Sequence, residues 1–239
     1  MLGNLVMNIS VALVVYVLGL ISRRALGYFA GTLPTKRVWK LESDPKVHVV
    51  TANTPPETRI DQKEFAVTGY ITEYMGAAHL SSALKRIYKQ AVFYYDMECF
   101  FDYRNLRENL ILIGGPVNNP ATGRLFRELE IPYEFDGFSL VHKKTDRRFD
   151  AVITDYIEED YALVVNCRNP FAGSGKSKKR CVLIAGCRTI GCYAGALYLA
   201  EHARQLKVGK HENYAFVVKI KGHSYSAIGD PELVEIEYF

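Results

Sequence analysis

The chain has 239 residues, a formal net charge of +4 at pH 7 and five cysteines without regular spacing. The small charge excludes a protein built to bind nucleic acid duplexes, and the odd cysteine count indicates a reducing compartment rather than a disulfide framework. The sequence contains no internal repeat and no low-complexity tract, which excludes a repeat protein.

The N-terminal segment is the most distinctive part of the chain. Residues 1–22 contain no charged side chain, and Arg23 and Arg24 follow immediately. A helix of about 20 apolar residues spans the hydrocarbon core of a bilayer. The segment therefore predicts a transmembrane anchor over residues 1–26, with a lipid bilayer as its partner.

Two other interpretations of this segment remain open. A cleaved secretory signal carries its positive charge before the apolar stretch, whereas here the basic residues follow it. A buried core helix fits poorly with a long uncharged run at the extreme N-terminus.

Charge predicts the orientation of the anchor, because basic residues next to a membrane span favour the cytoplasmic side. The basic residues that follow the apolar run are Arg23, Arg24, Lys36, Arg37 and Lys40. We expect a single-pass protein of the inner (cytoplasmic) membrane, with its N-terminus outside and its C-terminal domain in the cytoplasm. The same side chains can bind anionic lipid headgroups.

After a predicted juxtamembrane linker at residues 27–45, the chain alternates between strand and helix patterns. The expected strands cover residues 46–52, 92–99, 110–113, 149–154, 161–167, 181–185, 214–221 and 233–238. The expected helices cover residues 72–90, 120–129 and 190–206. Continuous apolar runs are typical of strands buried on both faces of a sheet. Residues 46–239 therefore predict a Rossmann-like three-layer α/β domain with a mostly parallel sheet and an antiparallel insertion.

Two turns of the expected sheet have the same design. In the first, a buried strand leads into residues 114–119 (GGPVNN) and a helix that Asn119 caps and Pro120 begins. In the second, a buried strand leads into residues 186–191 (GCRTIG) and a helix of small residues. Such turns place backbone N–H groups and a positive helix end where open α/β sheets bind anions. Tight turns also need glycine without any ligand, so a purely structural role is the alternative.

These turns and the loop after the first strand form the candidate ligand site. Glycine lets the backbone approach a ligand closely, Arg188 offers a bidentate contact to an anion, and Asn118 and Thr189 offer hydrogen bonds. The candidate ligand-binding residues are Thr51, Asn53, Gly114, Gly115, Asn118, Asn119, Gly186, Arg188, Thr189 and Gly191. We expect a small anionic ligand, above all a nucleotide, and no cofactor, metal or catalytic residue.

Three further features favour simpler interpretations. Residues 173–177 (GSGKS) look like the end of a Walker A loop, but Pro170 stands where the full motif requires glycine, and a strand follows. Cys187 and Cys192 lie near an expected helix N-terminus, where thiol pKa values fall, yet neither has an identifiable histidine partner. Glu73, Asp155 and the acidic residues 158–160 offer carboxylates for acid–base chemistry, although such residues are more often caps, turns or solvated groups.

The apolar run with its two arginines, and the strand–loop–helix units whose strands end at Ile113 and Ala185, together resemble the membrane effectors of prokaryotic antiviral immunity. In that group a CARF-type domain binds a cyclic oligoadenylate and controls membrane-embedded helices. Separately, the GGPxxN pattern from Gly114 to Asn119 and the AGxxxxG pattern over residues 185–191 are similar to segments of poorly characterised bacterial and archaeal proteins, some related to S-layers. That similarity implies no defined activity.

The resemblance to the immune effectors implies a membrane-anchored, nucleotide-sensing protein. We expect it to form a homo-oligomer and to act on the bilayer through its N-terminal helices. The first alternative is a membrane-tethered nucleotide or NAD hydrolase that uses a carboxylate such as Glu73 in the same cleft. The second alternative is a structural or surface protein whose α/β domain only makes contacts.

Overall fold

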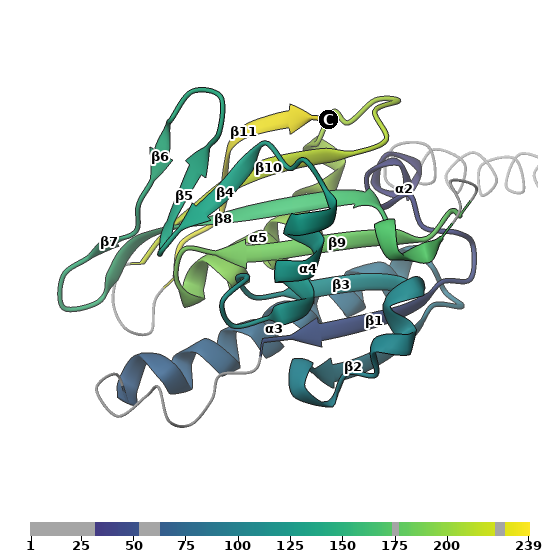
Figure 1. Ribbon diagram of the computed structural model, residues 1–239, viewed down its shortest axis with the longest axis horizontal. Helices are drawn as coiled ribbons and strands as arrows, with labels where there is room; N and C mark the ends of the chain where they lie inside the picture. The colour runs from purple at the N-terminus through teal and green to yellow at the C-terminus, as the bar shows by residue number, and fades with distance from the viewer. Residues whose placement is uncertain (1–31, 53–62, 174–176, 223–227) are drawn as a thin grey trace, which may run out of the picture.

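The computed structural model describes residues 32–52, 63–173, 177–222 and 228–239, with the backbone alone for residues 63–71. Its centre is a single large sheet with the strand order β11-β10-β8-β9-β3-β1-β2 (Figure 1). Four neighbouring strands run parallel: β9 (Arg180–Gly186), β3 (Asn109–Ile113), β1 (Lys46–Thr51) and β2 (Val92–Met97). The strands expected at residues 46–52, 110–113 and 181–185 are thus confirmed, and the structure shows that they are neighbours.

The other half of the sheet is antiparallel. It consists of β7 (Val152–Ile153), β8 (Ile157–Arg168), β10 (Tyr214–Lys221) and β11 (Glu232–Tyr238). Residues 169–179 connect β8 to β9, and this connection is shorter than the crossover that a parallel pair needs. The mixed α/β fold is confirmed, but its antiparallel part is half of the sheet rather than an insertion.

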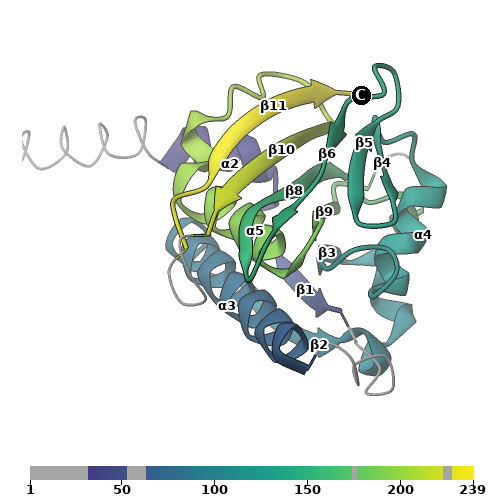
Figure 2. The ribbon, with the colours of Figure 1, turned by 90° about the vertical axis from the view of Figure 1, so that its left-hand side faces the viewer.

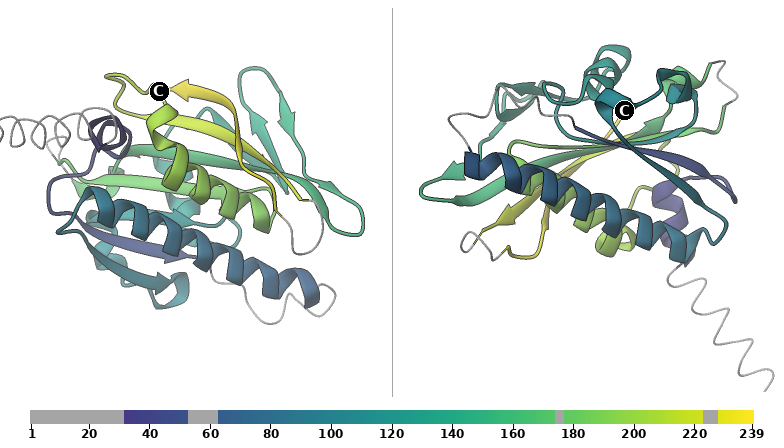
Figure 3. Two further views of the ribbon diagram at one scale, coloured as in Figure 1. Left: turned by 180° about the vertical axis from the view of Figure 1, so that it is seen from behind. Right: turned by 90° about the horizontal axis from the view of Figure 1, so that it is seen from below.

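Each face of the sheet carries its own layer (Figures 2 and 3). The helices α2 (Leu33–Trp39), α3 (Lys63–Ile87) and α5 (Thr189–His202), with the 3-10 helix η6 (Ala203–Gln205), pack on one face. The opposite face carries α4 (Pro120–Glu128) and a small sheet of β4 (Tyr133–Asp136), β5 (Ser139–His142) and β6 (Arg148–Phe149). The remaining 3-10 helices are η3 (Glu98–Phe100), η4 (Tyr103–Arg107) and η5 (Pro170–Ala172).

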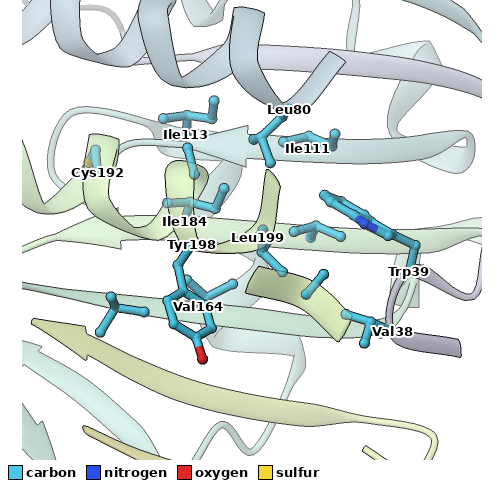
Figure 4. Packing of buried hydrophobic residues seen from close by; sticks show 14 of the residues in the cluster. Val38, Trp39, Leu80, Ile111, Ile113, Val164, Ile184, Cys192, Tyr198 and Leu199 are labelled. Atoms are coloured by element: carbon cyan, nitrogen blue, oxygen red, sulfur yellow. The ribbon is translucent and has the colours of Figure 1, made fainter. Parts of the chain in front are cut away.

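Part of the predicted linker belongs to the folded domain. Val38 and Trp39 of α2 are almost fully buried and pack in the same core as Leu80 and Leu199 (Figure 4). The side chain of Asn166 donates a hydrogen bond of 3.0 Å to the carbonyl of Val38. These contacts fix the start of the described chain against the sheet.

None of the helices in the described residues is both long and apolar enough to cross a bilayer. The predicted anchor over residues 1–26 lies outside the described residues.

Helices α3 and α5 approach closely because small residues line their contact. A Cβ atom built on Gly76 would lie 2.9 Å from the Cβ atom of Ala196. We expect Gly76→Leu to lower the free energy of unfolding by about 2 kcal/mol, since the larger side chain must push the two helices apart. Ala78→Leu, on the exposed side of the same helix, should change it by less than about 0.5 kcal/mol. Urea unfolding followed by circular dichroism measures both values, and equal values would show that the helices do not touch at Gly76.

Candidate functional site

The candidate site lies at the carboxyl edge of the parallel strands. From β1 the chain passes to α3 on one face, whereas from β3 it passes to α4 on the opposite face (Figure 3). β1 and β3 are neighbours, with Thr51 opposite Ile113 at their carboxyl ends. In open α/β sheets, ligands bind in the crevice outside such a topological switch point.

The first glycine turn combines one packed and one open glycine. Gly114 has φ +115°, and a Cβ atom there would lie 2.6 Å from the Cβ atom of Ala52. Its N–H donates a 2.9 Å hydrogen bond to the carbonyl of Ile184 in β9. By contrast, a Cβ atom built on Gly115 would meet open space. Gly114 therefore lets neighbouring turns pack, while Gly115 borders the space where a ligand can approach the backbone.

The two asparagines of this turn have different roles. Asn119 is fully buried: its amide group donates to the carbonyls of Val50 (3.2 Å) and Ile113 (3.1 Å). Its side-chain oxygen accepts the N–H of Thr122 and so caps α4, as the sequence predicts. Asn118 is exposed at the surface of the turn. All the hydrogen bonds of the Asn119 side chain described above are thus made within the fold, whereas the Asn118 side chain remains accessible to a ligand.

Glu73 and Thr51 lie at the carboxyl end of β1. Glu73, on α3, is 9% exposed, and its carboxylate accepts the N–H of Ala52 at 3.2 Å. The same carboxylate lies 3.5 Å from the Cβ position of Gly114, at the switch point itself. Thr51 is buried, and its hydroxyl donates a long hydrogen bond of 3.5 Å to the carbonyl of Asp96. The candidate residue Asn53 lies outside the described residues.

The second glycine turn contains an internal anion. Asp160 of β8 is fully buried, and its carboxylate accepts the N–H groups of Gly191 (2.6 Å), Tyr161 (2.8 Å) and Arg188 (3.0 Å). A Cβ atom on Gly191 would lie 2.4 Å from the carbonyl of Tyr161, and one on Gly186 would lie 2.3 Å from the carbonyl of Arg188. Asp160 therefore occupies the N-terminus of α5, where the sequence predicts an external phosphate or carboxylate.

Burial governs the ionisation of the groups around this turn. It raises the pKa of Asp160 to about 7, although the N–H donors of Gly191, Tyr161 and Arg188 act in the opposite direction. Burial also raises the pKa of Cys187 to about 12, and the nearby Asp160 carboxylate adds to this effect. The pKa of Cys192 is raised by burial first and by Glu73 second. Both thiols stay protonated at neutral pH, so the helix N-terminus does not activate them.

Arg188 and Thr189 are the remaining candidates of the second turn. The guanidinium carbon of Arg188 lies 3.7 Å from the ring centre of Phe138, which is 60% exposed in the turn between β4 and β5. Within the described residues, the Nε atom of Arg188 and the hydroxyl of Thr189 are buried without a hydrogen-bond partner. The carbonyl of Thr189 accepts the hydroxyl of Thr72 at 3.2 Å. The structure thus adds Phe138, which sequence reasoning missed; an aromatic residue after Gly137 in a hairpin turn was the available signal.

Two hollows lie elsewhere on the domain, on either side of Lys221. One has a volume of about 270 Å³ and includes Tyr156 and Glu158, and the other has about 280 Å³ and includes Asp230. Neither includes a residue of the glycine turns.

No family model, curated protein or solved structure matches this chain. The site is therefore interpreted from its geometry and chemistry alone. That geometry contains an open glycine, an accessible asparagine and a stacked arginine on the turns after β3 and β9, which are adjacent strands.

Proposed function

We propose that this protein is a membrane-anchored cytoplasmic sensor of a small anionic ligand, most simply a nucleotide. In this proposal the ligand lies over the carboxyl ends of β1, β3 and β9. Gly115, Asn118 and Arg188 contact its phosphate groups, and Phe138 lies beside its base. Binding changes the packing of a homo-oligomer and thereby acts on the bilayer through residues 1–26.

The pair formed by Arg188 and Phe138 carries the proposal. A planar guanidinium binds phosphate oxygens in a bidentate manner, and its stacking on the Phe138 ring holds its plane in place before a ligand arrives. The exposed remainder of that ring offers a surface on which a base can stack. Gly115 lets phosphate oxygens come close to the backbone, because no atom of the described residues lies within 4 Å of its Cβ position.

Binding of labelled cyclic oligoadenylates to the full chain tests this proposal. We expect Arg188→Gln to weaken binding by about tenfold to a hundredfold, as expected for the loss of a charged hydrogen bond. Arg168→Gln is the matched control, because Arg168 pairs with Glu212 at the opposite end of β8. Equal affinities for wild type and Arg188→Gln would remove Arg188 from the site, and absence of binding by wild type would exclude this ligand class.

A membrane-tethered nucleotide or NAD hydrolase is the second candidate, because the Glu73 carboxylate lies at the switch point beside Gly114. The same binding experiment separates the two functions. Consumption of the nucleotide by wild type, abolished in Glu73→Gln, supports the enzyme. Retention of intact ligand supports the sensor.

A further inference from the structure

Three segments far apart in the sequence meet at the end of the domain opposite the candidate site. α2 packs between the C-terminal end of α3 and the segment that follows α5 (Figure 3). The Nζ atom of Lys36 lies 5.4 Å from the ring centre of Tyr88, just after α3. Val38 and Trp39 share their hydrophobic core with Leu206, which follows η6.

These segments are rich in exposed cations. We call the following set the basic face: Arg37 of α2, Arg86 and Lys89 at the end of α3, and Arg204, Lys207 and Lys210 after α5. All six side chains are exposed. No ion pair within the described part of the chain involves any of them. Their positive charge is therefore available to an external partner.

Stabilisation of helix ends explains only part of this arrangement. Cations at a helix C-terminus interact favourably with the helix dipole, which accounts for Arg86 in the last turn of α3. Lys207 and Lys210 lie beyond the end of α5 and of η6, so this effect does not account for them. Around β4 to β8, by contrast, exposed acidic and basic side chains are mixed, and Arg148 pairs there with both Asp136 and Asp150.

The chain outside the described residues identifies the partner of the basic face. The uncharged run ends at Ser22, and α2 begins at Leu33, so ten residues separate them. Ten residues reach at most about 35 Å, even when fully extended. If residues 1–22 span a bilayer, α2 and the other two segments remain within reach of the headgroups. Cations in that position are attracted to anionic lipids, with roughly a fivefold gain in binding for each.

We propose that the basic face docks the domain onto anionic lipid headgroups of the membrane that holds the anchor. The proposal rests on the anchor of the proposed function, but not on its nucleotide site. Docking at this end leaves the carboxyl edge of the parallel strands, with Gly115 and Arg188, facing away from the membrane.

Hydrogen exchange on the full chain in nanodiscs tests this docking. The discs contain phosphatidylcholine alone, or phosphatidylcholine with about one third phosphatidylglycerol. We expect backbone amides of residues 204–211 and 86–91 to exchange several-fold more slowly in the anionic discs. The difference should disappear in about 0.5 M NaCl, because salt screens exposed charges.

Two triple variants remove different parts of the basic face, and a third serves as the control. The first variant is Arg204→Gln with Lys207→Gln and Lys210→Gln; the second is Arg37→Gln with Arg86→Gln and Lys89→Gln. Each should markedly reduce the protection by anionic lipid at both segments, since each removes three of the six attracted charges. The control removes three exposed cations from the opposite layer of the domain: Arg127→Gln, Lys143→Gln and Lys144→Gln. It should leave the protection unchanged.

Sedimentation with vesicles separates the failure of the docking proposal from that of the anchor. Sedimentation with neutral vesicles in high salt supports the anchor, and equal exchange in both discs would then overturn the docking proposal. Sedimentation with anionic vesicles alone, lost in both variants, supports the basic face although the anchor is wrong. Protection by an RNA oligonucleotide but not by anionic discs overturns the proposal in favour of a nucleic acid partner.

Discussion

Asp160→Ala is expected to lower the free energy of unfolding by about 4 kcal/mol at pH 8, which would make it among the most damaging single substitutions in the domain. The wild-type carboxylate accepts three backbone N–H groups at 2.6–3.0 Å, and the site is fully buried. Alanine leaves these donors without an acceptor, at roughly 1–3 kcal/mol for each. Removal of the buried charge offsets part of this cost, because burial disfavours the ionised carboxyl group. Urea unfolding measures the difference.

Asp160→Asn isolates one of these hydrogen bonds. Its side-chain oxygen still accepts the N–H groups of Tyr161 and Arg188, whereas its amide group faces the N–H of Gly191. We expect Asp160→Asn to lower the free energy of unfolding by about 2 kcal/mol, which places its stability between that of the wild type and that of Asp160→Ala. Glu158→Gln, a partly exposed change two residues earlier, should stay within about 0.5 kcal/mol. If Asp160→Asn were as stable as wild type, the hydrogen bond from Gly191 would contribute nothing to stability.

Asp160 also predicts how stability depends on pH. Its pKa is about 7 in the folded state, against 3.8 for an unperturbed aspartate carboxyl group. Between these two values the folded protein retains a proton that the unfolded chain has released. Stability contributed by this group therefore falls as the pH rises through this window, and it stays constant above about pH 7. The free energy of unfolding of the wild type should therefore decrease with rising pH in this window, and that of Asp160→Asn should decrease less steeply.

Asn119→Ala is the second substitution with a large expected effect. We expect it to lower the free energy of unfolding by about 3 kcal/mol. One side chain ties together the ends of β1 and β3, through the carbonyls of Val50 and Ile113, and also caps α4. Removing a helix cap alone costs about 1 kcal/mol, and the two buried carbonyls lose their side-chain donor as well.

Asn118→Ala provides the matched control for this residue. Asn118 precedes Asn119 directly but is exposed, so its replacement should change stability by less than about 0.5 kcal/mol. Asn118→Ala should instead weaken ligand binding under the proposed function. Thermal unfolding of both variants distinguishes the roles, and similar melting temperatures would contradict the assignment of Asn119 to the fold.

Much of the fold could be predicted from local patterns. Buried strands such as residues 110–113 are continuous apolar runs, and the cap and proline before α4 mark the start of that helix directly. The extent of antiparallel pairing could not be predicted, because it depends on which strand lies beside β9. The packing of Trp39 could not be predicted either. A short helix around Pro34 has the same sequence pattern whether it belongs to a linker or packs on the core.

The candidate site was predictable in position but not in chemistry. Glycines and caps mark both turns, and both lie at the carboxyl edge of the parallel strands. What occupies a turn depends on residues distant in sequence: Asp160 reaches the second turn from β8, and Glu73 reaches the first from α3. Such contacts have no signature within a turn, so a glycine turn filled by the protein itself and one open to a ligand look alike in sequence.

Helix α3 has 25 residues and is about 37 Å long at 1.5 Å per residue. It carries Glu73 beside the candidate site, and its last turn carries Arg86 of the basic face. A helix that joins these two places transmits a tilt without being deformed. Under the proposed function, an ångström-scale movement of α3 at Glu73 would therefore shift the far end of the helix against α2.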